Sequence, residues 1–139
     1  VGYYVRAEND PMTDHGMFTV STGVDNARAE EVIKAVLLEF KKLRDEKVSG
    51  EELTKVKDYI SGKLVLGLES SDSLAMFYGM QEVLREPLET PEVLTQKLRE
   101  VTSEDIMRVA RDIFTNERLN LALVGPFSDE KQFADILSV

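Results

Sequence analysis

The sequence predicts an α+β fold in which an antiparallel sheet of about three strands is covered by helices. Residues 1–9 and 16–24 alternate apolar and polar positions with the period of two that is typical of strands. Apolar residues then recur every three or four positions through most of residues 25–114, as they do in amphipathic helices. Residues 118–124 return to the period of two, so the expected order is strand, strand, helices, strand, helix.

The two early strands are rich in β-branched and aromatic residues, which favour pleated structure. Their apolar residues fall on one face each, namely Val1, Tyr3, Val5 and Ala7 in the first and Phe18, Val20, Thr22 and Val24 in the second. Residues 10–15 form a polar connection whose Pro11 cannot join a central ladder. An antiparallel pair is therefore the simplest interpretation.

The predicted helices begin at residues that cap helix N-termini. These starting positions are Asp25, the S-x-x-E box that opens at Ser49, Ser70, Thr90 before Pro91, Thr102 and Ser128. The first helix should bury Ala29, Val32, Ile33, Val36, Leu37, Phe40 and Leu43. The second should bury Leu53, Val56, Ile60, Leu64 and Leu68. For the third, the inward stripe comprises Leu74, Phe77, Tyr78 and Leu84, and Pro87 ends the helix.

The length of 139 residues fits a single domain over residues 1–139. A run of strands, then helices, then one returning strand indicates an incomplete sheet. Val1 already lies within a predicted strand. We therefore expect the chain to be a fragment whose domain has its first strands and a helix upstream.

The composition excludes several classes of function. The net charge is −9 and the sequence pI is about 4.7, which argues against binding to nucleic acids and to anionic membranes. Because the chain has no cysteine, it can hold neither a disulfide nor a thiolate metal site. Its longest apolar run, residues 64–68, is far too short to cross a bilayer.

The chain has few residues that could form a catalytic site by themselves. His15 is its one histidine, whereas hydrolytic zinc sites use three protein ligands. We interpret His15 as an exposed loop residue, with a role as a ligand as the alternative. The paired carboxylates at residues 30–31, 51–52 and 104–105 fall in the first turns of predicted helices, where they complement the helix dipole. General acid–base catalysis by these pairs is the alternative.

Two adjacent tyrosines remain as candidates for a binding role. On a regular strand, Tyr3 and Tyr4 point to opposite faces, so one should pack inward and the other should present its phenol outward. The pattern alone favours a structural role for both, and contact of one of them with a ligand is the alternative.

Six segments in this order resemble the pitrilysin/insulinase family of zinc metallopeptidases, which includes mitochondrial processing peptidases. They are Gly2-Tyr3-Tyr4-Val5, Gly16-Met17-Phe18-Thr19-Val20, the junction of Lys41-Lys42-Leu43-Arg44 with Val48-Ser49-Gly50-Glu51-Glu52-Leu53 and Lys55, Leu68-Glu69-Ser70, Val101-Thr102-Ser103-Glu104-Asp105-Ile106 and Leu121-Ala122-Leu123-Val124-Gly125-Pro126. Together they cover nearly the whole chain and match the later portion of the family's second, non-catalytic half-domain.

The resemblance implies an α/β half-domain that pairs with a catalytic half-domain or partner subunit carrying the zinc motif H-x-x-E-H. Zinc then belongs to the full-length protein or its partner, and this chain holds no metal and is inactive alone. Tyr3 falls on a tyrosine of the family that binds the substrate backbone, and Tyr4 is the alternative if the register differs by one. The arginine that accompanies it would lie upstream of Val1. Peptide substrates and a homo- or heterodimeric full-length protein follow from the same resemblance.

Three functions remain open at this level. The first is a substrate-cradling C-terminal half-domain of a zinc metalloendopeptidase. The second is an inert structural or assembly subunit of the same family. The third is a free-standing α+β binding module that is unrelated to peptidases.

Overall fold

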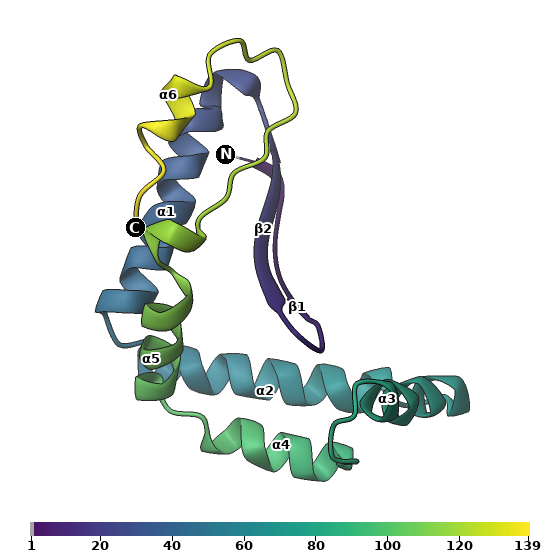
Figure 1. The fold of residues 1–139 in the computed structure, drawn as a ribbon. Coiled ribbons are helices and arrows are strands. Elements are labelled where there is room, and N and C mark those ends of the chain that lie inside the picture. The colour runs from purple at the N-terminus through teal and green to yellow at the C-terminus, as the bar shows by residue number, and fades with distance from the viewer. Residues whose placement is uncertain (1) are drawn as a thin grey trace. The chain divides into compact units, whose positions relative to one another are not determined.

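The computed structural model describes residues 2–139 and confirms an α+β fold (Figure 1). Within these residues it contains one two-stranded antiparallel sheet and six α-helices. Two compact units are present, one built from residues up to 47 together with residues 106–139, and the other from residues 48–105. No helix in the described part of the chain has the length and apolarity that crossing a membrane requires.

The predicted antiparallel pair is confirmed. Strands β1 (Gly2–Pro11) and β2 (Gly16–Val24) pair from Gly2 opposite Val24 to Pro11 opposite Gly16. The connecting turn closes with a hydrogen bond of 2.8 Å from the Met12 amide to the His15 carbonyl. Pro11 is tolerated because it is the last residue of β1. The prediction for Val1 lies outside the described residues.

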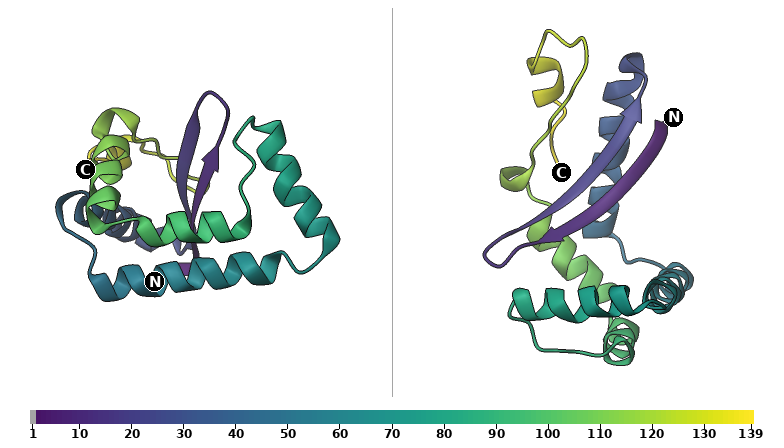
Figure 2. Two further views of the ribbon diagram at one scale, coloured as in Figure 1. Left: turned by 90° about the horizontal axis from the view of Figure 1, so that it is seen from below. Right: turned by 90° about the vertical axis from the view of Figure 1, so that its right-hand side faces the viewer.

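An aromatic cluster joins a strand and two helices of the first unit. The rings of Phe40 and Phe114 stack at 4.3 Å, and Phe18 meets both edge-on at 6.0 and 5.5 Å. Phe18 comes from β2 and Phe40 from α1 (Ala29–Asp45), while Phe114 directly follows α5 (Ser103–Ile113). All seven predicted inward residues of α1 are buried or half-buried. The cluster therefore packs β2 against α1 and the end of α5 (Figures 1 and 2).

Most predicted helix starts are confirmed by their hydrogen bonds. Ser49 caps α2 (Gly50–Gly67), Ser70 caps α3 (Ser71–Val83) and Thr90 caps α4 (Pro91–Glu100), each side chain accepting from the amide three residues later. At α5, Thr102 and Asp105 bond reciprocally, since each side chain accepts from the other's amide. Asp25 caps the short 3-10 helix η1 (Asn26–Arg28), which precedes α1.

The three-strand count is not confirmed. After the 3-10 helix η2 (Asn116–Arg118), residues 119–124 form no regular element and pair with no strand within residues 2–139. Leu121 and Leu123 are exposed by 38% and 39%, and Val124 is fully exposed. A strand assignment needs a ladder partner, which the alternating pattern cannot supply. The final helix, α6 (Lys131–Ala134), starts later than the predicted Ser128.

Helices α2 and α4 lie side by side in the second unit (Figure 2). The ammonium of Lys57 on α2 donates to the carbonyls of Arg99 and Val101 at 2.7 and 2.5 Å, where α4 ends. The predicted inward stripe of α2 is wrong at Val56 and Ile60, which are exposed. No residue among 48–105 is buried. The helices of this unit therefore do not enclose a core of their own, and part of their apolar surface stays exposed.

Helix α3 ends in a left-handed residue that is not glycine. Arg85 has a φ of 57°, its amide donates to the Glu82 carbonyl, and the Glu86 amide donates to the Gln81 carbonyl at 2.9 Å. This is a Schellman ending, in which glycine is the usual residue because a Cβ is strained at positive φ.

Replacing Phe114 by alanine should destabilise the chain by about 3 kcal/mol, because it removes a buried ring that touches two others. Urea denaturation followed by circular dichroism measures the loss. Phe114→Leu retains most of the volume and should cost less. Equal effects of the two substitutions would contradict the stacked cluster.

Replacing Arg85 by glycine should stabilise the second unit by about 0.5–1 kcal/mol, because relief of the left-handed strain outweighs the added backbone entropy of glycine. Thermal and urea unfolding measure the change. The matched control is Glu82→Gly, which lies inside α3 and should destabilise by about 1 kcal/mol. A loss of stability in Arg85→Gly would show that Arg85 is not left-handed.

Candidate functional site

Tyr3 lies on an irregularity of β1. The register pairs Gly2 with Val24 and Tyr4 with Gly23, so Tyr3 is an extra residue on its strand. Such a β-bulge changes the direction of side chains and occurs often beside functional sites. The Tyr3 side chain is 86% exposed. The bulge therefore presents a phenol, a hydrogen-bond donor and acceptor, on the open side of a strand.

Tyr4, the alternative candidate, is held by its neighbours on β2. Its ring lies over Gly23, where an added Cβ would come within 2.8 Å of the Tyr4 ring. The hydroxyl of Thr22 donates to the Tyr4 carbonyl at 2.7 Å. Of the two tyrosines, Tyr4 thus packs on the hairpin and Tyr3 is the more accessible.

The structure does not bring His15 near the tyrosines. His15 lies in the turn of the hairpin and Tyr3 lies at the other end of the strands. The Nδ1 atom of His15 is 2.6 Å from a carboxylate oxygen of Asp14, and both side chains are exposed. Within residues 2–139 no three histidine, cysteine or acidic side chains are grouped in a way that could hold a metal ion. The described residues therefore do not fit a zinc centre.

The paired carboxylates have local structural roles at helix starts. Glu30 and Glu31 lie in the first turn of α1, where Glu30 accepts from Lys34 at 2.5 Å and Glu31 receives two hydrogen bonds from Arg28. The hydrogen bond from Lys34 lowers the pKa of Glu30, and that from Arg28 lowers the pKa of Glu31. Carboxylates with lowered pKa values are poor general bases at neutral pH.

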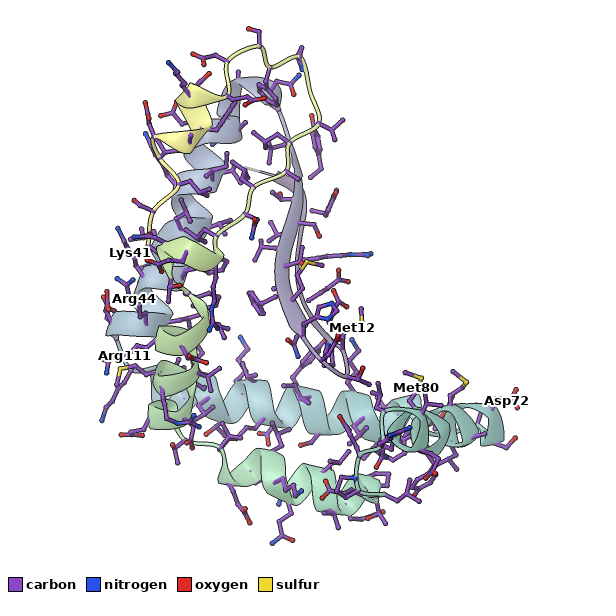
Figure 3. The ribbon with its side chains drawn as sticks, in the orientation of Figure 1. Met12, Lys41, Arg44, Asp72, Met80 and Arg111 are labelled. Carbon is purple, nitrogen blue, oxygen red and sulfur yellow. The ribbon has the colours of Figure 1, made fainter. Side chains whose placement is uncertain are left out.

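A group of basic side chains surrounds the end of α1 (Figure 3). Arg44 bonds to Asp45 at 3.1 Å, and Arg111 on α5 donates to the Arg44 carbonyl at 3.0 Å. The hydrogen bond from Arg44, with smaller contributions from Arg111 and Lys41, lowers the pKa of Asp45. Positive charge here complements the C-terminal end of the helix dipole, so this cluster has a structural explanation.

Two concave sites on the chain are lined by residues other than the tyrosines. A groove of about 600 Å³ lies between α3 and α4, and a hollow of about 290 Å³ lies between α1 and residues 136–138. Tyr3, Tyr4 and His15 line neither of them. The candidate binding residue therefore sits on an open strand, which suits an extended ligand better than a compact one.

Comparison with known proteins finds similarity to one peptidase family. Residues 1–60 match the family model described as the Peptidase M16 inactive domain, and this match includes β1, β2, α1 and the start of α2.

Individual relatives match over almost the whole chain. The chain is 29% identical to the alpha-2 subunit of the mitochondrial-processing peptidase of Dictyostelium discoideum over 125 residues, which are 90% of the chain and 27% of that protein. Identity is 27% to an uncharacterised zinc protease of Bacillus subtilis, over 91% of the chain and 31% of the relative. It is 24% to subunit 2 of the human cytochrome b-c1 complex, over 91% of the chain and 29% of the relative.

Residues 1–60 are thus similar to the inactive domain of the M16 peptidase family, and the relatives named above extend the similarity over most of the chain. This confirms the resemblance stated from the sequence motifs. The chain spans about three-tenths of the length of the curated relatives it matches.

Replacing Arg28 by glutamine should raise the pKa of Glu31, because the guanidinium that lowers it is lost. An NMR titration of the Glu31 carboxyl carbon should move its midpoint to higher pH. A carboxyl whose pKa is lowered in the folded state stabilises that state above its unfolded pKa, and this contribution is lost as the pH falls. Lys42→Gln, whose partner is Glu39, is the matched control. An unchanged Glu31 midpoint in Arg28→Gln would contradict the pair.

Proposed function

We propose that this chain is a non-catalytic, substrate-cradling part of a zinc metalloendopeptidase, and that Tyr3 is its contact with the peptide. The observation that carries the proposal is the exposed phenol of Tyr3 on the bulge of β1. The similarity to the inactive domain supports it, because that domain belongs to a family of zinc peptidases.

The exposed edge of β1 supports the peptide-binding role. Residues 3–11 are all exposed, and β1 pairs with β2 on one side only within the described residues. An extended peptide can add to such an edge by main-chain hydrogen bonds. Tyr3 would then donate a hydrogen bond to a peptide carbonyl, and to the oxyanion that develops there during hydrolysis. Zinc and the attacking water would come from a catalytic half-domain or partner subunit.

We further propose that residues 1–139 belong to one domain whose sheet is completed by strands outside this chain. Residues 119–124 keep the alternating pattern of a strand, and Leu121, Leu123 and Val124 are exposed. Pairing with a further strand would satisfy the backbone and cover these side chains. The limited share of each relative that the chain covers is consistent with this proposal.

An inert assembly subunit is the second candidate. It is favoured by the similarity to a subunit of the human cytochrome b-c1 complex, whose name describes membership of a complex. The same fold would serve either role, so zinc content and peptide cleavage must distinguish them. A free-standing binding module is the third candidate, and it predicts a monodisperse chain that binds no zinc-bearing partner.

The test compares the 139-residue chain alone, its zinc-bearing counterpart alone, and the two together. The counterpart is the polypeptide from the same source that carries H-x-x-E-H. We expect the chain alone to bind no stoichiometric zinc and to cleave no fluorogenic peptide, and the complex to do both. Zinc binding and cleavage by the chain alone would contradict the proposal. A zinc-loaded complex that is no more active than the counterpart would favour the assembly role.

In the active complex, Tyr3→Phe should lower kcat by about tenfold to a hundredfold, since it removes one positioned hydrogen-bond donor. Stability should not change, because the Tyr3 side chain is exposed. Tyr4→Phe is the matched control and should retain nearly full activity. A loss of kcat in Tyr4→Phe with full activity in Tyr3→Phe would assign the role to Tyr4 instead.

A further inference from the structure

The second unit contains a groove that the peptidase function does not use. It is bounded by α3, the connection at residues 84–90 and α4. Figure 2 shows the course of these three segments. Its volume is about 600 Å³. The apolar side chains that line it are Met76, Phe77, Met80, Leu84, Pro87 and Leu94.

The walls of this groove are held by hydrogen bonds within the chain. The side-chain amide of Gln81 donates to the Glu89 carbonyl at 3.2 Å and accepts from the Glu89 amide at 2.7 Å. Lys97 on α4 forms an ion pair with Glu89. The Schellman ending at Arg85 fixes the first residues of the connection. Because these contacts need no ligand, the groove is preorganised, which reduces the entropic cost of binding.

Methionine side chains form the exposed rim of the groove. Met76 is 65% exposed and Met80 is 48% exposed, and Val83 lies further along α3 with 73% exposure. Figure 3 shows Met80 on α3. Methionine is flexible and polarizable, so it adapts to apolar partners of different shape. An exposed apolar ridge beside a preformed groove indicates a site of protein interaction.

The charged residues that line the groove are Glu86, Glu89 and Lys97, and Glu89 is paired with Lys97. The segment from Glu69 to Glu92, which supplies most of the lining, has six acidic residues and one basic residue, Arg85. Glu86 itself lines the groove. A partner that places lysine or arginine beside its apolar side chains would be complementary to this rim, whereas an acidic partner would be repelled.

The hydrogen bonding of the walls favours a helical partner. The walls are mainly helices, whose backbone groups bond internally, and Gln81 already bonds to the connection. A strand would find no ladder of open backbone groups on α3 or α4. A helix satisfies its own backbone and needs only an apolar stripe to enter a groove.

We propose that the groove between α3 and α4 binds an amphipathic helix of a partner protein whose apolar stripe is flanked by lysine and arginine. The apolar residues of that helix contact Met76, Met80 and Leu84, and its basic residues lie near Glu86. The proposal does not rest on the peptidase role, because binding requires neither zinc nor Tyr3.

The direct test labels the methionine methyl groups of the 139-residue chain with ¹³C and follows them by NMR. The chain has five methionines, at positions 12, 17, 76, 80 and 107. The probe is a synthetic peptide of about five helical turns, about 18 residues, built from leucine, lysine and alanine with leucine on one face. We expect the methyl signals of Met76 and Met80 to shift on titration and those of Met12 and Met17 to stay. Shifts at Met12 and Met17 without shifts at Met76 and Met80 would overturn the proposal.

Charge and groove variants sharpen the test. A peptide with glutamate in place of every lysine should bind at least about tenfold more weakly, and Glu86→Lys should weaken binding of the lysine peptide in the same direction. Met80→Asp should weaken binding by about tenfold, whereas its matched control Met17→Asp, on β2, should not. Circular dichroism confirms the fold of each variant. Equal binding of the two peptides, or equal effects of Met80→Asp and Met17→Asp, would overturn the proposal.

Discussion

The aromatic contact among Phe18, Phe40 and Phe114 is the interaction on which the first unit depends. It joins a strand, a helix and the end of a second helix that lie far apart in the sequence. Because Phe18 packs from β2, the cluster holds the hairpin by one strand and leaves β1 on the outside. The exposure of Tyr3 follows from this arrangement, as does the irregular pairing that displays it.

The same arrangement leaves backbone groups of β1 and apolar side chains of residues 119–124 exposed. A long exposed edge strand and an unpaired apolar segment are hazards for a soluble protein unless another polypeptide segment pairs with them. In the role we propose, β1 offers its edge to a peptide and residues 119–124 accept a strand of the complete domain. In the further role we propose, the apolar groove of the second unit gives the chain a separate surface for a partner helix.

Local signals in the sequence predicted much of the fold. The hairpin and four helix caps were predictable because alternation, Pro11 and capping side chains act within a few residues of chain. The third strand was not predictable from residues 119–124 alone, because a strand also needs a partner. Val56 and Ile60 fit an amphipathic pattern, yet the packing of α2 against α4 leaves them exposed.

The candidate site was only partly predictable. One histidine and no cysteine argue from composition against a metal site in this chain, whereas Tyr3 was preferred over Tyr4 through a resemblance and not through its pattern. The bulge that separates Tyr3 from Tyr4 depends on cross-strand register, which no single strand encodes. The groove was missed because Met76 and Met80 lie outside the predicted stripe of α3, and a concave surface requires the positions of α4 and the connection.

Hydrogen–deuterium exchange tests most directly whether this chain is one part of a larger sheet. In the chain alone, the amides of residues 120–124 should exchange rapidly, because no ladder protects them. In the complex with the zinc-bearing counterpart or in the full-length protein, they should slow by at least about a hundredfold. The amides of β2 that already pair with β1 serve as the internal reference. Equal protection of residues 120–124 in the isolated chain and in the complete protein would contradict an unfinished sheet.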